Sequence, residues 1–323
     1  MTYTLAGDLG GTKMAAALMD AAGHVILEQS RPTQADQGIE TVTERLATLL
    51  NEVRASALEK KPSACGVAVL GLVDTASGEM RFAANLPGAQ GYPLRRRLET
   101  ALAMSVVIEN DIRSHALGEY TFGAARGLDN FLFVAVGTGI GGTFYVNSRL
   151  YPGAYQVAGE IGHLVVDSSS TAPPCGCGQR GCLEALASGP AIVADFLRQA
   201  AEQGVKLETD SVNPKGTFSL QKIAEWANHS DARGALARQA IENGAQVLGR
   251  GLSGGVNLLD PGHVILGGGV AQLGSRWLDT VRQTMAKHVL PQLKDTAIEL
   301  AQLGSQAALA GASVLARQGL HVH

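Results

Sequence analysis

The sequence Gly-Asp-Leu-Gly-Gly-Thr-Lys at residues 7–13 separates two short apolar segments, 2–6 and 14–19. Apolar and β-branched residues favour strands, and adjacent glycines favour a tight turn, so we predict a β-hairpin with a third strand at 25–29. Glycines at such a turn let backbone N–H groups approach an anion. The hairpin is therefore a candidate phosphate loop, and the alternative is a plain β-turn that binds nothing.

A second glycine run, Gly-Thr-Gly-Ile-Gly-Gly at 137–142, lies between predicted strands at 130–136 and 143–146. It contains the spacing of a dinucleotide-binding fingerprint, but that fingerprint opens a helix, whereas a strand follows here. We therefore predict a second hairpin loop of the same design as the first. Two such hairpins in one chain predict an α/β protein of two similar lobes with a cleft between them.

Helices and strands alternate in the rest of the chain, and apolar spacing predicts each of them. Helices are expected at 38–56, 94–103, 112–122, 190–202, 220–227, 232–259, 276–287 and 307–318, and strands at 66–70, 105–109, 263–266 and 297–303. The polar segment 204–217 is expected to be a surface loop. The last helix is rich in small residues, so we expect it to pack tightly, back across the first half of the chain.

Composition and charge exclude several classes of protein. A chain of 323 residues predicts two domains, and 46% apolar residues supply a core. The formal net charge of −3 gives no bulk attraction to nucleic acid or to an anionic membrane. No apolar run reaches the roughly 18 residues of a membrane helix, and the start of the chain does not resemble a secretory signal. We expect a cytoplasmic protein.

Three of the four cysteines, Cys175, Cys177 and Cys182, lie within eight positions, and His163 precedes the first of them by twelve. Thiolates and an imidazole are the ligands that tetrahedral Zn²⁺ prefers, so the sequence predicts a closed structural zinc site. The alternative is a set of free thiols in a glycine-rich loop. Cys65 stands apart and is expected in the core.

Polar residues at predicted strand ends are further candidates for chemistry. Asp111 could act as a general base or simply cap the helix that follows it, and Asn110 could hydrogen-bond a polyol. Asp8 could hold Mg²⁺ directly or through water. The run Gly267-Gly268-Gly269 follows a buried strand and suits the nucleoside end of a nucleotide, or else marks a crowded strand–helix junction.

Six motifs in this order resemble the repressor, open reading frame, kinase (ROK) family of sugar kinases, in the actin-like ATPase and hexokinase superfamily. They are GDLGGTK, ENDI, GTGIGG, the Glu160–His163 run EIGH, CGCGQRGCLE and DPGHVILGGG. The resemblance covers essentially the whole chain and implies an actin-like ATPase fold with ATP, Mg²⁺ and structural Zn²⁺ as cofactors. It implies transfer of phosphate to the 6-hydroxyl of a hexose.

The resemblance also implies roles for matching residues. The ATP-binding positions are Asp8, Gly10, Gly11, Thr12, Lys13, Gly137, Thr138, Gly139, Gly141, Gly267, Gly268 and Gly269. The sugar-binding positions are Asn85, Asn110, Asp111, Glu160, His163 and Glu184, with Asp111 as the catalytic base. The zinc ligands are His163, Cys175, Cys177 and Cys182, so that His163 serves both metal and sugar.

For the lobes, we expect a smaller one at 1–120, completed by a C-terminal helix at 305–323, and a larger one at 121–304. The larger lobe would carry the zinc loop and the dimer surface, because the resemblance implies a homodimer.

Glucose is the leading substrate, and N-acetylglucosamine, N-acetylmannosamine or another hexose is the alternative. A sugar-binding transcriptional regulator is the remote alternative; it would need a DNA-binding domain, and the first phosphate loop begins here at residue 7.

Overall fold

The computed structural model describes residues 3–57, 59–207 and 218–319. Most of the predicted loop at 204–217 and the end of the predicted segment 305–323 thus lie outside the described residues. The chain forms two compact units. The first comprises Met1–Leu128, Leu150–Ala158 and Ala301–His323, and the second comprises Asp129–Arg149 and Gly159–Leu300.

In the first unit the described strands form a five-stranded mixed sheet of order β3-β2-β1-β4-β7. Its strands are β1 (Tyr3–Leu9), β2 (Lys13–Met19), β3 (Val25–Pro32), β4 (Pro62–Val69) and β7 (Val106–Asn110). The first three are antiparallel, as predicted, and β4 and β7 run parallel to β1. Because parallel strands end at the same edge of a sheet, the carboxyl ends of β1, β4 and β7 adjoin there.

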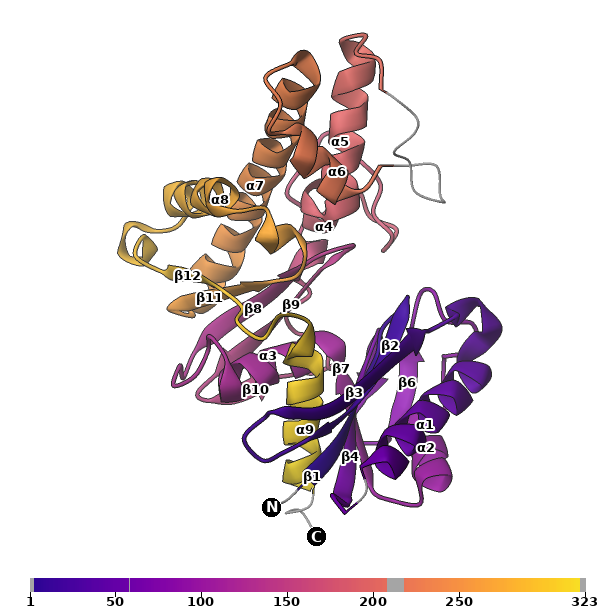
Figure 1. Ribbon diagram of the computed structural model, residues 1–323. Helices are drawn as coiled ribbons and strands as arrows, with labels where there is room; N and C mark the ends of the chain where they lie inside the picture. Colours follow the sequence, from indigo (N-terminus) through magenta and orange to yellow (C-terminus); the bar gives the residue numbers. More distant parts are fainter. Residues whose placement is uncertain (1–2, 58, 208–217, 320–323) are drawn as a thin grey trace. The chain divides into compact units, whose positions relative to one another are not determined.

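The two faces of this sheet carry side chains of different size. Leu5, Leu9 and Leu18 face the core under α1 (Gly38–Ser56) and α2 (Leu94–Leu102). Alanines of β1, β2 and β4 face α9 (Ala307–Gly319) instead. Figure 1 shows α9 lying along β1 and β4. Small residues on both surfaces let this helix approach the sheet closely, as its composition predicts.

Two glycines fix that close approach. A Cβ on Gly66 of β4 would lie 1.9 Å from the carbonyl oxygen of Ala312 in α9. A Cβ on Gly311 would lie 1.8 Å from the carbonyl oxygen of Ser114 in α3 (Asp111–Phe122). Both contacts are to backbone atoms, which cannot move aside like a side chain.

We expect Gly311→Ala to lower the free energy of unfolding by about 2–3 kcal/mol, because the added methyl group must push α9 away from α3. Urea denaturation measures this. Gly254→Ala is the matched control: Gly254 also lies in a helix, but its Cβ would meet nothing nearer than 3.6 Å. Alanine has the higher helix propensity, so the control should be neutral or stabilising by up to about 1 kcal/mol. Equal stabilities for the two variants would contradict the packing argument.

A two-stranded hairpin, β5 (Leu72–Asp74) and β6 (Glu79–Phe82), follows β4 in the first unit. The sequence does not predict it. Other boundaries also differ, since β4 begins at Pro62 instead of residue 66 and α3 begins at Asp111 instead of residue 112.

The second unit repeats the sheet of the first, with order β10-β9-β8-β11-β12 among the described strands. These are β8 (Phe131–Val136), β9 (Ile140–Val146), β10 (Arg149–Tyr151), β11 (His263–Gly267) and β12 (Ala297–Leu300). Here β8 and β9 are antiparallel, and β11 and β12 run parallel to β8. The predicted duplication is confirmed. The predicted strand at 297–303 ends three residues early, at Leu300.

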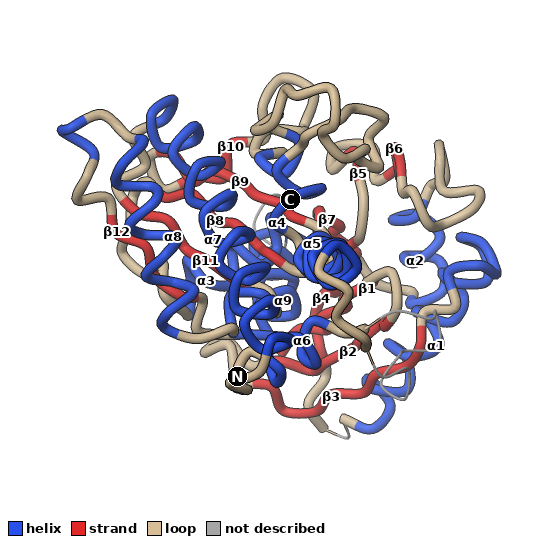
Figure 2. Tube along the Cα trace, turned by 90° about the horizontal axis from the view of Figure 1, so that it is seen from above, coloured by secondary structure: helices blue, strands red, loops and turns tan. Residues whose placement is uncertain are grey.

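Helices cover this second sheet, and Figure 2 shows α7 and α8 beside its strands. They are α4 (Leu183–Ala187), α5 (Gly189–Glu202), α6 (Leu220–Trp226), α7 (Ala232–Leu259) and α8 (Ser275–His288). Their apolar faces and the strands form one buried core that includes Phe196, Leu248 and Leu266. Among the helices of the described ranges, none combines the length and apolar character needed to cross a bilayer.

Candidate functional site

The first glycine hairpin joins β1 to β2 in the first unit. The Gly10 N–H donates to the Lys13 carbonyl oxygen at 3.1 Å, which closes the turn. Thr33 of the neighbouring segment braces it: its hydroxyl donates to the Gly10 carbonyl oxygen at 2.7 Å, and its N–H donates to the Thr12 carbonyl oxygen at 2.9 Å. Residues 11–13 are exposed at the tip. Thr33 thus fixes the backbone of the loop by hydrogen bonds, while the tip of the loop faces solvent.

Asp8 and Asp111 lie at the carboxyl edge of the first sheet, one near the end of β1 and the other directly after β7. Burial raises the pKa of Asp8 to about 6, and the nearby charge of Asp111 adds to this increase. Burial likewise raises the pKa of Asp111. His115 opposes the shift at both carboxylates, so the three groups share one site. No motif in the sequence marks His115; its spacing of four from Asp111 on a helix was the available signal.

We expect Asp8→Asn to stabilise the ligand-free protein at neutral pH. A carboxyl group whose pKa is raised on folding costs stability where it is ionised, and here that cost grows as the pH rises from about 4 to 6. Asparagine carries no charge, so its advantage should be absent near pH 4 and reach the order of 2–3 kcal/mol above pH 6. Thermal unfolding at pH 4 and pH 7.5 measures it. A gain that is equal at both pH values would contradict the burial argument.

Asn110, and not Asp111, is the N-cap of α3. The Asn110 Oδ1 accepts the Arg113 N–H at 3.2 Å, and Asp111 is already the first helical residue. The alternative interpretation of Asp111 as the cap of this helix is therefore wrong, because the turn that ends β7 places the preceding residue at the helix start. The Asn110 Nδ2 donates to the Gly71 carbonyl oxygen at 2.9 Å and to the Asp111 Oδ1 at 3.1 Å.

Arg113 is a buried charge two residues after Asp111, and no motif in the sequence marks it. Its guanidinium pairs with Glu109 at 3.3 Å. It also donates to the carbonyl oxygens of Pro152, at 3.3 Å, and Gln156, at 2.6 Å. A buried guanidinium requires such partners. These hydrogen bonds hold segment 150–158 against the start of α3. The segment ends two residues before Glu160.

The second glycine hairpin joins β8 to β9 in the second unit. The Gly137 N–H donates to the Gly139 carbonyl oxygen at 2.9 Å. Two contacts from the α4–α5 segment hold it: the Gly189 N–H donates to the Gly137 carbonyl oxygen at 2.8 Å, and the Glu184 Oε2 accepts the Ile140 N–H at 2.8 Å. The predicted hairpin is present, and the Glu184 contact is one that the motif alone does not reveal.

In the third glycine run, Gly268 lies at a crowded junction and Gly269 lines a cavity. Gly268 has a φ of +87°, and a Cβ there would lie 2.3 Å from the Val136 carbonyl oxygen, so it marks a crowded junction. Gly269 lines a cavity of about 750 Å³ in the second unit, whose other walls include Arg238, Arg276 and Trp277. A cavity of this size can hold a nucleoside.

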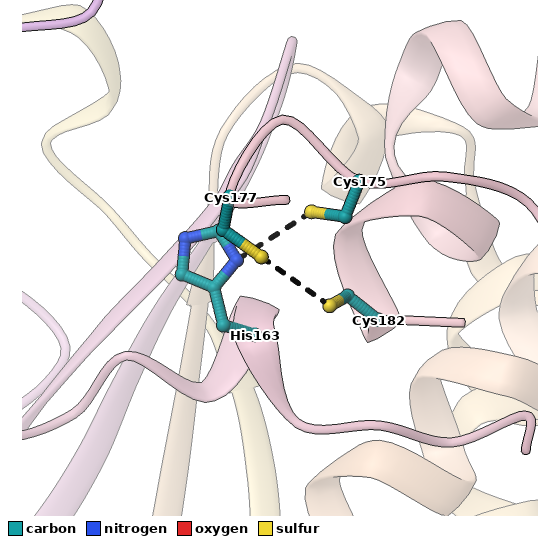
Figure 3. A group of neighbouring side chains, drawn as sticks. All are labelled: His163, Cys175, Cys177 and Cys182. Carbon is teal, nitrogen blue, oxygen red and sulfur yellow. Dashed lines mark hydrogen bonds between the residues drawn. The ribbon is translucent and has the colours of Figure 1, made fainter. Parts of the chain in front are cut away.

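The four predicted zinc ligands converge in the second unit (Figure 3). Their ligand atoms all lie within 4.8 Å of one another. Tetrahedral zinc, with bonds of about 2.3 Å to sulfur and 2.0–2.1 Å to nitrogen, requires about 3.8 Å between two sulfurs and about 3.6 Å between sulfur and nitrogen. The Cys177 and Cys182 Sγ atoms are 3.7 Å apart, and the Cys175 Sγ is 3.6 Å from the His163 Nδ1. The side chains present therefore fit a zinc ion.

The two ring nitrogens of His163 face different groups. Its Nδ1 faces the cysteines, and its Nε2 lies 4.0 Å from the Glu160 Oε2. Both side chains are partly exposed, 37% for His163 and 45% for Glu160, so they can be reached by a ligand. A metal on Nδ1 would fix the tautomer and leave Nε2–H as a donor.

The structure divides the remaining predicted site residues between the two units. The first unit holds Asp8, Gly10, Gly11, Thr12, Lys13, Asn85, Asn110 and Asp111. The second unit holds Gly137, Thr138, Gly139, Gly141, Glu160, His163, Glu184, Gly267, Gly268 and Gly269. Asn85 is exposed on the loop between β6 and α2. Each unit thus holds one glycine hairpin and one set of polar side chains.

Residues 4–319 match the model of the ROK family. This chain belongs to the ROK family. It is 31% identical to a glucokinase of Halalkalibacterium halodurans over 318 residues, which are 96% of this chain and 94% of the relative. It is 32% identical to an N-acetylmannosamine kinase of Escherichia fergusonii over 314 residues, 97% and 98% of the two chains.

A solved structure extends the likeness of this ROK protein to three dimensions. The ROK family glucokinase of Streptomyces griseus, in complex with glucose and AMPPNP, superposes with a TM-score of 0.82 at 31% identity. The match covers 98% of this chain and 100% of that one. Together with the paired five-stranded sheets, it confirms the predicted family and the actin-like ATPase fold.

Proposed function

We propose that this ROK protein is an ATP-dependent sugar kinase that transfers the γ-phosphoryl group of ATP to the 6-hydroxyl of a hexose. The observation that carries the proposal is the pairing of Asp8 and Asp111 at one sheet edge, next to an exposed glycine hairpin. Phosphoryl transfer needs a base at the attacking hydroxyl and fixed donors at the phosphates. This edge offers both.

Asp111 is the proposed general base. A base accepts a proton best when its pKa approaches the working pH, and burial moves the pKa of Asp111 upward. Asp8 and the two hairpins would bind the triphosphate with Mg²⁺, which neutralises phosphate charge when bound. The cavity beside Gly269 would take the nucleoside.

The sugar is proposed to lie among Asn85, Asn110, Asp111, Glu160, His163 and Glu184. Both hydrogens of the Asn110 amide are already donated within the protein, so only its Oδ1 has capacity left. Asn110 would therefore accept a hydrogen bond from a sugar hydroxyl and donate none. Glucose leads as substrate, and N-acetylglucosamine, N-acetylmannosamine or another hexose is the alternative. A glucokinase and an N-acetylmannosamine kinase match this chain with similar identity, 31% and 32%.

A coupled ADP-release assay tests the proposal with glucose, mannose, fructose, allose, N-acetylglucosamine and N-acetylmannosamine. Turnover with one hexose at a kcat/KM at least about tenfold above the others would identify the substrate. ADP release with none of them, together with sugar binding by calorimetry, would reject the kinase proposal and favour a sugar-binding regulator.

We also propose a homodimer formed through the second unit. Large apolar side chains are exposed there: Val165 at 54%, Leu258 at 77% and Leu290 at 58%. The Asn257 Nδ2 donates to the His288 carbonyl oxygen, and its Oδ1 accepts the Leu290 N–H, so the ends of α7 and α8 adjoin. Leu258 and Leu290 therefore lie near each other, and exposed apolar side chains that gather in this way are typical of protein interfaces.

Sedimentation at micromolar concentration should therefore give a mass near twice the 33.5 kDa of one chain. Leu258→Glu places a charge in the proposed interface and should shift the mass toward one chain, while Ile26→Glu, on an exposed strand of the first unit, should not. A wild-type mass of one chain would reject the dimer.

A further inference from the structure

Helix α4 begins directly after a residue of the Cys/His cluster and carries a side chain that contacts the second glycine hairpin. Cys182 immediately precedes this helix as its N-cap residue, and Ser188 follows it and caps α5 with its side chain. The helix is five residues long, so no flexible connection separates the cluster from its side chains. Its Glu184 carboxylate faces both features: Oε2 accepts the Ile140 N–H at 2.8 Å, and Oε1 lies 3.9 Å from the Cys175 Sγ.

The residue that precedes His163 of the cluster adjoins the same hairpin position. Gly162 precedes His163, and a Cβ on Gly162 would lie only 1.9 Å from the Ile140 carbonyl oxygen. Ile140 is thus held at its N–H by Glu184 and crowded at its carbonyl by the loop that carries His163. The Gly189 N–H holds the first residue of the hairpin, Gly137, at 2.8 Å.

Gly139 shows how closely the carboxylate approaches the hairpin. A Cβ on Gly139 would lie 2.5 Å from the Glu184 Oε2. Gly139 does not have a positive φ, so its backbone would accept alanine and the conflict is with Glu184 alone. Residue 139 therefore has no room for a side chain while Glu184 occupies this position.

We propose that Glu184 is a positioning residue that ties the phosphate-binding hairpin at 137–142 to the Cys/His cluster. By holding the Ile140 peptide, it keeps the hairpin N–H groups in the orientation that receives the phosphates of ATP. This inference rests on the proposed kinase function and adds a nucleotide role to a residue whose expected partner was the sugar. A hydrogen bond to a charged acceptor is among the stronger ones in proteins, so its loss should loosen the hairpin.

Calorimetric binding of AMPPNP with Mg²⁺ to the full chain, without sugar, tests the proposal. Glu184→Ala should weaken AMPPNP binding about tenfold, since the Ile140 N–H loses its acceptor. Glu184→Gln keeps an amide oxygen that can accept the same N–H, so its AMPPNP affinity should stay within about threefold of wild type. Glu202→Ala, which removes an exposed carboxylate of α5, is the matched control and should bind as wild type does.

Gly139→Ala gives a second and independent arm. Its added methyl group should displace Glu184 and weaken AMPPNP binding about as much as Glu184→Ala does. In the double variant the methyl group has no carboxylate to meet, so it should add less than about threefold to the effect of Glu184→Ala. If the two substitutions weaken AMPPNP binding by factors that simply multiply in the double variant, the proposal is overturned. This arm remains informative if Glu184→Ala does not fold.

Metal removal tests the connection to the cluster. Chelator-treated wild-type protein should bind AMPPNP about tenfold more weakly than zinc-loaded protein and recover when zinc is restored. The AMPPNP affinity of Glu184→Ala should change by less than about threefold on the same treatment.

AMPPNP binding by Glu184→Ala within twofold of wild type would overturn the positioning role and leave Glu184 to the sugar. Equal binding by chelated and loaded wild type would overturn the link to the cluster. Failure of wild type to bind AMPPNP at all would reject the kinase proposal itself, and no variant is needed to see it.

Discussion

Asp111→Asn should reduce kcat by about 10²–10⁴ while the protein stays folded, because asparagine cannot accept the proton of the attacking hydroxyl. Asparagine is nearly isosteric and keeps an Oδ1 at this position, and the bond that caps α3 joins Asn110 to the Arg113 N–H. Sugar affinity should stay within about tenfold of wild type. Steady-state kinetics with calorimetric sugar binding separates the two effects.

The change in thermal stability that Asp111→Asn causes has a predictable direction. Burial raises the pKa of Asp111 on folding, so the ionised carboxylate costs stability at neutral pH and is relieved of that cost as the pH falls. Removing the charge should therefore leave the melting temperature at pH 7.5 equal to or above that of wild type. For the same reason the acid limb of the wild-type kcat/KM profile should lie above the ordinary aspartate pKa.

Asp279→Asn is the control for these measurements, since Asp279 is an exposed residue of α8 that pairs with Arg282. It should keep full activity. A kcat for Asp111→Asn within a few-fold of wild type would remove Asp111 from the mechanism. A collapse of both kcat and melting temperature would instead assign Asp111 a structural role.

Cys182→Ser should lower the zinc content of the purified protein from about one equivalent per chain to near zero. Cys182 is fully buried in the cluster, and loss of a direct ligand should weaken zinc binding by more than the roughly 10–100-fold that follows loss of an outer partner. Elemental analysis of protein purified without added zinc measures this.

The same variant should lose sugar affinity and thermal stability. The cluster joins the loop that carries Glu160 to the helix that carries Glu184, so metal binding contributes to the order of both. Cys65→Ala is the control: Cys65 is buried in the core of the first unit and should keep one equivalent of zinc even if stability falls. Full zinc content and full activity in Cys182→Ser would contradict a zinc site.

Both sheets and most long helices could be predicted from the sequence because their signals are local. Short apolar strands end at glycine runs, and α1 carries apolar residues at helical spacing. The elements that the sequence did not predict, such as β5, β6 and α4, are three to five residues long. Such short segments carry no complete period, so contacts from elsewhere in the fold determine them.

The candidate site shows the same division. Glycine runs and acidic residues at strand ends are visible in the sequence, and the cysteine spacing indicates a metal. The partners of Arg113 are not visible, because Gln156 lies 43 positions away in the chain. Glu184 is 44 positions from Ile140, so its contact with the hairpin likewise appears only when the chain is folded.

The position of α9 has a consequence for synthesis on the ribosome. The second unit is complete once residue 300 has emerged, but the first unit lacks the helix that covers the alanine face of its sheet until residues 307–319 follow. The half of the protein that is translated first is therefore the half that finishes folding last. Until then its alanine-lined surface is exposed to other nascent chains, and we expect a ribosome-stalled fragment ending at residue 300 to be protease-resistant in its second unit and degraded in its first.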